Sequence, residues 1–293
     1  MATAHEKRLR LRELMAKPEL IVAPSSFNPL SACLIESVGF PAVHVSGSAV
    51  NRFHAYSDLG FLGLAEMVAL HERIADATHG PIVGDAEAGF GGPLHVARSV
   101  RAYERSGVAA IHIEDEIVPK DPDPKAHSVI AVSQMVEKLK AALDARTDPS
   151  FVIIARSNAR ASEPLAQVIE RAAAYAESGV DALWPGVSAK EELKDLSRFF
   201  SIPLVGVPRR AQVSLSEYGQ YGFKIACIPG IVGQAATYGM AELLEVFHRT
   251  GSDEEFWKKH PEAERWREWF SSLGREQEEG ILNRIGNQGK RQK

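Results

Sequence analysis

Residues 106–113 read Ser-Gly-Val-Ala-Ala-Ile-His-Ile, in which a glycine and one apolar residue precede a short apolar run. Three further copies of this pattern have Gly39, Gly179 and Gly222 in the glycine position. Each copy follows a segment with helical spacing, and glycine suits the left-handed residue that commonly ends a helix. We therefore expect a strand to begin shortly after each glycine, over residues 42–45, 110–113, 182–184 and 225–228.

Four more short apolar runs lie between these copies, over residues 20–23, 81–84, 151–154 and 203–207. Nearly continuous apolar strands are typical of a parallel sheet, and strict alternation with helices indicates βα units. Eight such units predict an α/β fold, a (β/α)8 TIM-type barrel over residues 1–247. An open doubly wound sheet is the alternative, but Ala23 is followed by Pro24-Ser25-Ser26-Phe27 and not by the GxGxxG signature of that fold.

The composition favours a globular protein that binds neither nucleic acid nor membrane. The 293 residues are 45% hydrophobic and 25% charged, with a formal net charge of -4. A large core is therefore possible, and a basic surface for a phosphate backbone is not expected. No segment approaches the ~20 apolar residues of a membrane span. Because Cys33 and Cys227 lie far apart and form no metal motif, we expect a cytoplasmic location.

Residues 248–293 depart from the barrel pattern and are expected to form a C-terminal helical extension. Their charged helical pattern carries five large aromatic residues, Phe256, Trp257, Trp266, Trp269 and Phe270. Composition leaves two roles open. These side chains either cover the floor of the barrel or dock on a neighbouring subunit, and the enrichment of aromatic residues in protein interfaces would suit the second role.

Acidic residues gather where the predicted strands end. Asp58 follows the second strand, Asp85 and Glu87 follow the third, and Glu114-Asp115-Glu116 ends the fourth. Active sites of β/α barrels lie at the C-terminal ends of the strands, so we expect several of these side chains to meet. Clustered carboxylates repel one another unless a cation lies between them. Oxygen ligands without a histidine or cysteine grouping favour a hard ion such as Mg2+ or Mn2+.

Other polar residues near the strand ends are candidates for binding a substrate. Arg156 ends the fifth strand and offers a planar fork, either to a substrate carboxylate or to one of the barrel acids. His44 and His112 lie inside strands and are expected to be packed core histidines. Residues 119–127 form a polar loop whose prolines disfavour helix and whose charges disfavour burial, which makes it a candidate lid.

Four segments together resemble the isocitrate lyase and phosphoenolpyruvate mutase superfamily, and the resemblance runs from about Pro24 to Leu243. They are Ser46-Gly47-Ser48, Gly84-Asp85-Ala86-Glu87-Ala88-Gly89-Phe90-Gly91, Ile113-Glu114-Asp115 with Pro119-Lys120, and Ile154-Ala155-Arg156. The resemblance implies a Mg2+ site formed by Asp58, Asp85, Glu87 and Glu114. It also implies a substrate-carboxylate site formed by Ser46, Gly47, Ser48 and Arg156, to which we add Asn158.

The same resemblance implies an activity and an assembly. Members of the superfamily typically stabilise an enolate on the metal, which acts as a Lewis acid. We therefore expect a Mg2+-dependent carbon-carbon lyase acting on a 2-oxo or 2-hydroxy (di)carboxylic acid, by retro-aldol cleavage or decarboxylation. The alternatives are a phosphonate mutase or hydrolase and a non-catalytic carboxylate-binding barrel. A homotetramer whose C-terminal helix packs on a neighbour is also implied, which favours the docking role for the aromatic residues.

The chain departs from the superfamily pattern in ways that bear on mechanism. The segment after Lys120 lacks the cysteine of the lysine-arginine-cysteine-glycine-histidine loop found in lyases of this group. Retro-aldol cleavage would need a substitute for it, whereas decarboxylation needs no base to deprotonate a hydroxyl group. The candidates for catalysis are Lys120, Asp123, His127 and Arg156, with Asp121 a further proton carrier, and His127 titrates nearest neutrality. Glu87 and Asn158 stand where aspartates are usual.

Overall fold

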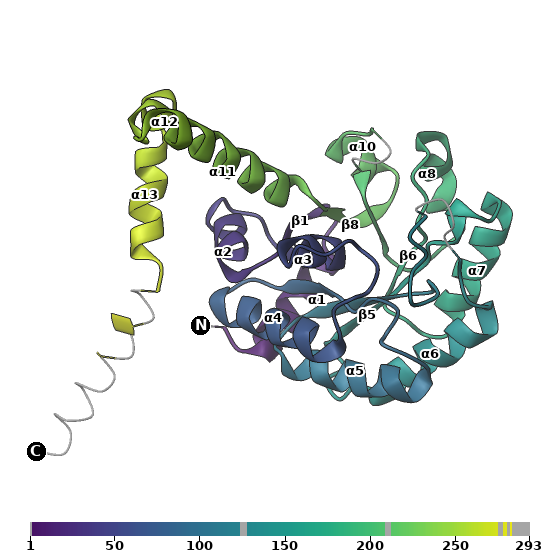
Figure 1. The fold of residues 1–293 in the computed structure, drawn as a ribbon. Coiled ribbons are helices and arrows are strands. Elements are labelled where there is room, and N and C mark those ends of the chain that lie inside the picture. Colours follow the sequence, from purple (N-terminus) through teal and green to yellow (C-terminus); the bar gives the residue numbers. More distant parts are fainter. Residues whose placement is uncertain (1, 124–127, 209–211, 275–277, 280–281, 283–293) are drawn as a thin grey trace, which may run out of the picture. The chain divides into compact units, whose positions relative to one another are not determined.

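Eight parallel strands close into a barrel in chain order, each paired with its neighbours and β8 with β1 (Figure 1). The computed structural model describes residues 2–123, 128–208, 212–274, 278–279 and 282. The strands are β1 Ile21–Ser26, β2 Val43–Val45, β3 Ile82–Asp85, β4 Ala110–Glu114, β5 Val152–Arg156, β6 Ala182–Trp184, β7 Leu204–Gly206 and β8 Phe223–Ile228. The predicted (β/α)8 barrel and all eight predicted strands are therefore confirmed.

Helices alternate with the strands and surround the barrel (Figure 1). The helices of the barrel unit are α1 Ala4–Ala16, α2 Pro29–Ser37, α3 Gly47–Phe53, α4 Leu64–Ala77, α5 Pro93–Arg105, α6 Val132–Ala145, the 3-10 turn η1 Ala159–Ala161, α7 Leu165–Glu177, α8 Lys190–Leu196 and α10 Leu215–Gln220. The glycines of the repeated pattern have φ values of +100°, +89°, +94° and +85° at positions 39, 107, 179 and 222. They adopt the left-handed conformation that the repeated pattern predicted.

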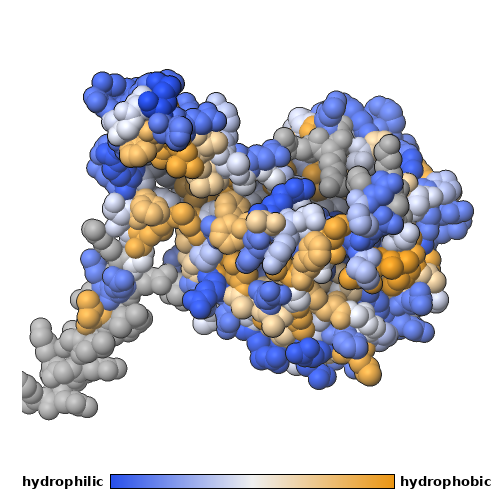
Figure 2. Space-filling model, viewed as in Figure 1, coloured by the Kyte–Doolittle hydropathy of each residue, from blue (hydrophilic) through white to orange (hydrophobic). Residues whose placement is uncertain are grey.

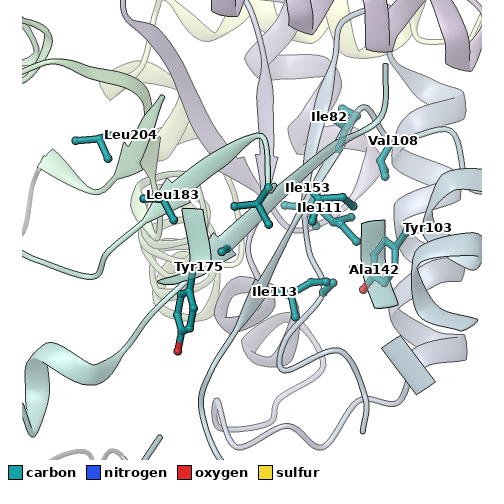
Figure 3. Close-up of a cluster of buried hydrophobic side chains, with 14 of the residues drawn as sticks. Ile82, Tyr103, Val108, Ile111, Ile113, Ala142, Ile153, Tyr175, Leu183 and Leu204 are labelled. Atoms are coloured by element: carbon teal, nitrogen blue, oxygen red, sulfur yellow. The ribbon is translucent and has the colours of Figure 1, made fainter. Parts of the chain in front are cut away.

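Alternate residues of each strand face the barrel interior and the surrounding helices. Outward residues such as Ile111 and Ile153 pack with helix residues such as Tyr103 and Tyr175 in one buried cluster (Figure 3). Inward residues such as Val83, Ala110 and Ile154 form a second cluster. Every second side chain of a strand points into the barrel. At the C-terminal ends of β3, β4 and β5 the inward side chains are polar.

Helix α1 closes the N-terminal end of the barrel. Leu11 is fully buried among the inward residues of the strands. Arg8 donates to the carbonyl oxygens of Val108 and Glu104, and Arg12 donates to three carbonyl oxygens in residues 149–151. With this end occupied, an accessible site can form at the opposite end, where the strands end in polar residues.

The chain divides into two compact units, residues 2–233 and residues 234–293. The second unit holds most of α11 Ile231–Thr250, together with α12 Glu254–Lys259 and α13 Ala263–Ser272. Apolar side chains are exposed on these helices, as the orange patches in Figure 2 show, and they include Leu244, Phe247 and Phe270. Among the described residues, no helix combines the length and the apolar composition that a membrane span requires.

Candidate active site

A small polar cavity of about 110 Å³ lies at the C-terminal ends of the strands. Seven of the residues predicted to form the site line it: Ser46, Ser48, Asp58, Asp85, Lys120, Arg156 and Asn158. Two more of them, Glu87 and Glu114, contact Lys120 directly. Side chains from three strands, β3, β4 and β5, and from the intervening loops therefore meet at one place.

In the turn after β2, the backbone lies close to Asp85 and Glu87 at the end of β3. Ser46 caps the N-terminus of α3, and the amide nitrogen of Gly47 donates to Oδ2 of Asp85 at 2.8 Å. A Cβ atom on residue 47 would lie 2.3 Å from Oε1 of Glu87, closer than any real contact. Glycine at this position leaves room for the carboxylate of Glu87, which a larger side chain would displace.

Asp85 is a buried carboxylate held from both sides. Its Oδ1 accepts from the amide nitrogen of Glu87 at 2.9 Å, and its Oδ2 accepts from Gly47. Burial alone would raise the pKa of Asp85, but His112, Arg156 and Lys120 together lower it below the ordinary value. Asp85 is therefore an ionised acceptor with a fixed orientation.

Lys120 lies inside the acidic cluster. Its Nζ atom is 2.9 Å from Oε2 of Glu87, 2.9 Å from Oε1 of Glu114, 3.6 Å from Oε2 of Glu116 and 3.7 Å from Oδ1 of Asp58. The expectation that charges keep this loop from burial is wrong for Lys120, whose side chain is only 10% exposed. Burial lowers its pKa, but the surrounding carboxylates raise it well above the ordinary value, so Lys120 stays a cation.

Glu87 has an unusual environment and an unusual backbone. Its φ of +48° is rare for a residue other than glycine, and such strain persists only where the surroundings impose it. Burial, Asp85 and Glu114 raise the pKa of Glu87 to about 8, although Lys120 acts in the opposite direction. The cations of the protein therefore do not balance all the carboxylates of the cluster. The carboxyl group of Glu87 holds a proton at neutral pH.

The donor chemistry of the cluster suits a hard divalent ion. Every candidate ligand atom is a carboxylate oxygen. Oδ1 of Asp58 is buried without a hydrogen-bond partner in the described part of the chain, and Oε1 of Glu114 is buried and contacts the ammonium group of Lys120. No three acidic, histidine or cysteine side chains among residues 2–123, 128–208 and 212–274 converge as they would around a bound ion. Lys120 lies between the carboxylates, so a divalent ion would share or take the position of its ammonium group.

Arg156 is placed for both roles that the sequence left open. Its Nη1 lies 3.3 Å from Oε2 of Glu114 and 3.7 Å from Oδ2 of Asp85, which pairs it with the barrel acids. Its guanidinium group also stacks over the ring of Trp184, 4.9 Å from the centroid, and lines the cavity. Its Nη2 donates to Oδ1 of Asn158 at 3.4 Å.

Asn158 ties the ends of β4 and β5 together. Its Nδ2 donates to Oε2 of Glu114 at 3.0 Å and to Oε2 of Glu116 at 3.1 Å. Asp115 points away from the cavity and accepts from Ser157, Tyr175 and the amide nitrogen of Asn158. Asp115 therefore positions the end of β5, while its two acidic neighbours face the site.

Of the two other loop candidates, the structure describes only Asp123. Asp123 is exposed and does not line the cavity. His127 lies outside the described residues. Of the four candidates for catalysis, the structure brings Lys120 and Arg156 to the cavity.

The chain matches the phosphoenolpyruvate phosphomutase family over residues 11–247. It belongs to the phosphoenolpyruvate mutase/isocitrate lyase superfamily. A 2-methylisocitrate lyase from Aeropyrum pernix is 33% identical over 86% of this chain and 83% of its own length. An oxaloacetate decarboxylase from Pseudomonas fluorescens is 36% identical over 68% of this chain and 69% of its own.

Solved structures of the superfamily share the fold over nearly the whole chain. A phosphonopyruvate hydrolase in complex with oxalate and Mg2+ superposes with a TM-score of 0.85 and 26% identity. The match covers 97% of this chain and 99% of that one. This member therefore holds a divalent ion together with a small dicarboxylate.

Four residues in or next to the site were not predicted from the sequence. They are Glu116, Trp184, His44 and His112. Glu116 is the last acid of the Glu114-Asp115-Glu116 run. It lies two residues after Glu114, and this spacing in an extended chain is the signal that both side chains face the same way. Trp184 occupies the inward position at the end of β6 and lines the cavity. The two histidines occupy inward positions of their strands, where His44 lines the cavity, and strand alternation could have placed them there.

Proposed function

We propose that this chain is a Mg2+-dependent carbon-carbon lyase that acts on a small 2-oxo or 2-hydroxy carboxylic acid. The observation that carries the proposal is the cavity at the strand ends, where a cluster of buried carboxylates faces Arg156 and Lys120. The relatives named above include a lyase and a decarboxylase, both of which break a carbon-carbon bond of a carboxylic acid.

Four carboxylates would hold the ion, those of Asp58, Asp85, Glu87 and Glu114. A bound divalent ion supplies a Lewis acid that withdraws electrons from a carbonyl oxygen of the substrate. Glu87 must lose its proton to join this set, because its pKa is about 8. Mg2+ is the ion whose preference for carboxylate oxygens and for few protein ligands best suits this cluster, and Mn2+ is chemically close.

The substrate carboxylate would be bound next to these acids, in the cavity that Arg156 lines. Arg156 offers its planar fork, and the side chains of Ser46, Ser48 and Asn158 line the same space. A cavity of about 110 Å³ has room for a small acid and little else. Trp184 and Val207 add apolar surface to the lining of the cavity.

Lys120 acts through its charge. Because the carboxylates raise its pKa, it remains protonated near neutral pH and cannot accept a proton. Retro-aldol cleavage therefore requires another base, for which we propose Asp123 or His127 of the loop after β4. Decarboxylation requires none. Both reactions leave an electron-rich fragment that the cations of the site stabilise.

We also propose that the chain forms a homo-oligomer, a tetramer by the superfamily resemblance, through its C-terminal helices. Leu244 is 66% exposed, Phe247 is 52% exposed and Phe270 is 60% exposed on α11 and α13. Large apolar side chains exposed together commonly mark a protein interface.

A panel of 2-oxo, 2-hydroxy and phosphono acids, incubated with the protein and Mg2+, tests the proposed reaction. Proton NMR of the products identifies the bond that breaks, and EDTA provides the metal-free control. We expect pyruvate or another oxo acid from a carbon substrate, only with metal present. Turnover of a phosphono acid alone would favour the phosphonate mutase or hydrolase reading, and binding without turnover would favour the non-catalytic reading.

A further inference from the structure

Arg171 is a buried arginine on α7 that contacts both the loop after β4 and the loop after β5. Its Nη1 donates to the carbonyl oxygen of Ile130 and to the hydroxyl group of Tyr175, both at 2.9 Å. Its Nε and Nη2 donate to the two carboxylate oxygens of Glu163. A buried charge is costly unless it is paired. Glu163 supplies that pair, which leaves Nη1 to bind the two neutral oxygens.

Tyr175 carries the contact from Arg171 to the end of β4. Arg171 has no acceptor atom, so the hydroxyl group of Tyr175 accepts from it and gives its one proton to Oδ2 of Asp115 at 2.9 Å. The same carboxylate accepts from Oγ of Ser157 at 2.7 Å and from the amide nitrogen of Asn158 at 2.9 Å. These hydrogen bonds form a buried path from α7 to the first residues of the loop after β5.

Ile130 is the point at which the loop after β4 returns to the barrel. Its amide nitrogen donates to the carbonyl oxygen of Asp115 at 2.9 Å, and its carbonyl oxygen accepts from Arg171. Beside it, the amide nitrogen of Ile117 donates to the carbonyl oxygen of Ser128 at 2.9 Å. The base of the loop is therefore closed by backbone hydrogen bonds, and Arg171 fastens it to α7.

We propose that Arg171 is a positioning residue for the site, because it holds the loops after β4 and β5 in one arrangement. Through Ile130 it holds the base of the loop that carries Lys120, and through the buried path it holds Asn158. Lys120 and Asn158 contact the two oxygens of one carboxylate, that of Glu114. The planar group of an arginine donates in several fixed directions at once, whereas the ammonium group of a lysine is a single point of charge.

Amide hydrogen exchange of the metal-free protein tests this arrangement. In Arg171→Lys the charge remains and the bridge is lost. We expect the amide groups of Ile130 and Asn158 to exchange about tenfold faster than in wild type, because local opening of the two loops becomes easier. The amide group of Val152 donates to the carbonyl oxygen of Ala109 at the N-terminal end of the strands and should exchange at the wild-type rate.

Tyr175→Phe separates the two contacts of Arg171. It keeps the ring in the buried cluster of Figure 3 and removes only the hydroxyl group. The path to Asn158 is then cut, and the contact between Arg171 and Ile130 remains. We therefore expect faster exchange at Asn158 and little change at Ile130.

Arg146→Met is the control, because this arginine also pairs with a carboxylate and donates to a carbonyl oxygen, but away from the cavity. Both loop amides should exchange at the wild-type rate in this variant. Two results in Arg171→Lys would overturn the proposal. Equal acceleration of the loop amides and of Val152 would show that Arg171 serves only the overall stability, and unchanged loop amides would show that it holds neither loop.

Titration of Mg2+ into the same variants tests whether the arrangement bears on the site, and this part rests on the proposed function. We expect Arg171→Lys to weaken binding by about threefold or more, less than the 10- to 100-fold typical of direct partners of a metal ligand. Arg146→Met should bind as wild type does. Unchanged affinity in Arg171→Lys would contradict the positioning role. If wild-type protein binds no Mg2+, the proposed function fails, and the exchange rates still decide whether Arg171 holds the loops.

Discussion

The Nζ atom of Lys120 lies 2.9 Å from Oε1 of Glu114, and this contact joins a polar loop to the buried end of β4. A lysine from outside the strands thus supplies positive charge at the centre of the acidic cluster. A divalent ion placed among the same carboxylates would meet the repulsion of this ammonium group. The occupancy of the site by a metal and the position of Lys120 are therefore expected to depend on each other.

Replacement of Lys120 by methionine is expected to raise the affinity for Mg2+ by about tenfold or more. Two unit charges about 4 Å apart interact by about 4 kcal/mol at an effective dielectric constant of 20, so part of that repulsion disappears with the ammonium group. Turnover should fall by about 100-fold, because the transition state loses a cation. Titration calorimetry and rate measurements check both effects.

Lys138→Met is the matched control for this variant. Lys138 is also buried, but its ammonium group donates to the carbonyl oxygen of Ala88 and makes no ion pair within 4 Å among the described residues. We expect little change in its Mg2+ affinity. Weaker metal binding in Lys120→Met than in wild-type protein would mean that Lys120 supports the metal site and does not oppose the ion.

Mg2+ binding at pH 7 is expected to release close to one proton per ion. Glu87 has a pKa of about 8, so at pH 7 the free protein carries a proton that the metal must expel. Affinity should therefore increase as the pH rises toward 8 and level off above it. Calorimetry in two buffers with different ionisation enthalpies measures the release, which Glu87→Gln should abolish. A binding enthalpy independent of buffer in wild-type protein would contradict this assignment.

The loop after β4 is expected to carry the proton-transfer group if the reaction is a retro-aldol cleavage. His127→Ala should then lower kcat by about 100-fold, since general acid-base catalysis typically contributes 10²- to 10⁴-fold. Asp123→Ala and Asp121→Ala test the two acids of the loop in the same way. Turnover within a few-fold of wild type in both His127→Ala and Asp123→Ala would favour decarboxylation.

Removal of residues 251–293 is expected to yield smaller assemblies. The deletion removes α12 and α13 with Phe256, Trp257, Trp266, Trp269 and Phe270, the aromatic side chains proposed to cover a neighbouring subunit. A shorter deletion of residues 275–293 keeps both helices, and this protein should form assemblies with the same number of subunits as wild type. Light scattering compares the two proteins. The same mass for the longer deletion as for wild type would contradict the docking role.

Much of the fold could be predicted because its signals are local. Gly107 ends a helix by its own conformational freedom, and the apolar run after it needs no distant partner to be recognised as a strand. The acids of the site were also predictable, since Asp85 and Glu114 end their strands and strand ends meet in a barrel. Arg156 was predictable in the same way, because it ends β5.

The parts that could not be predicted depend on contacts between distant segments. The burial of Lys120 results from attraction to carboxylates on other elements, which outweighs the preference of a charged loop for water. The contact between His44 and His112 links strands that are not neighbours in the sheet, so no pairing rule brings their rings together. The pKa of Glu87 likewise depends on how deeply the loop after β3 is buried.

Titration of Mg2+ into wild-type protein and into Asp85→Ala tests the central claim, that the acids at the strand ends form a divalent metal site. Asp195→Ala removes an exposed acid that pairs with Arg198 on the surface and serves as the control. Asp85→Asn keeps the shape of the side chain and guards against a folding defect, and thermal melting confirms that all variants fold. We predict one ion bound per chain in wild type and in Asp195→Ala, and loss of tight binding in both Asp85 variants. Unchanged affinity in folded Asp85→Ala would contradict the assignment of the site.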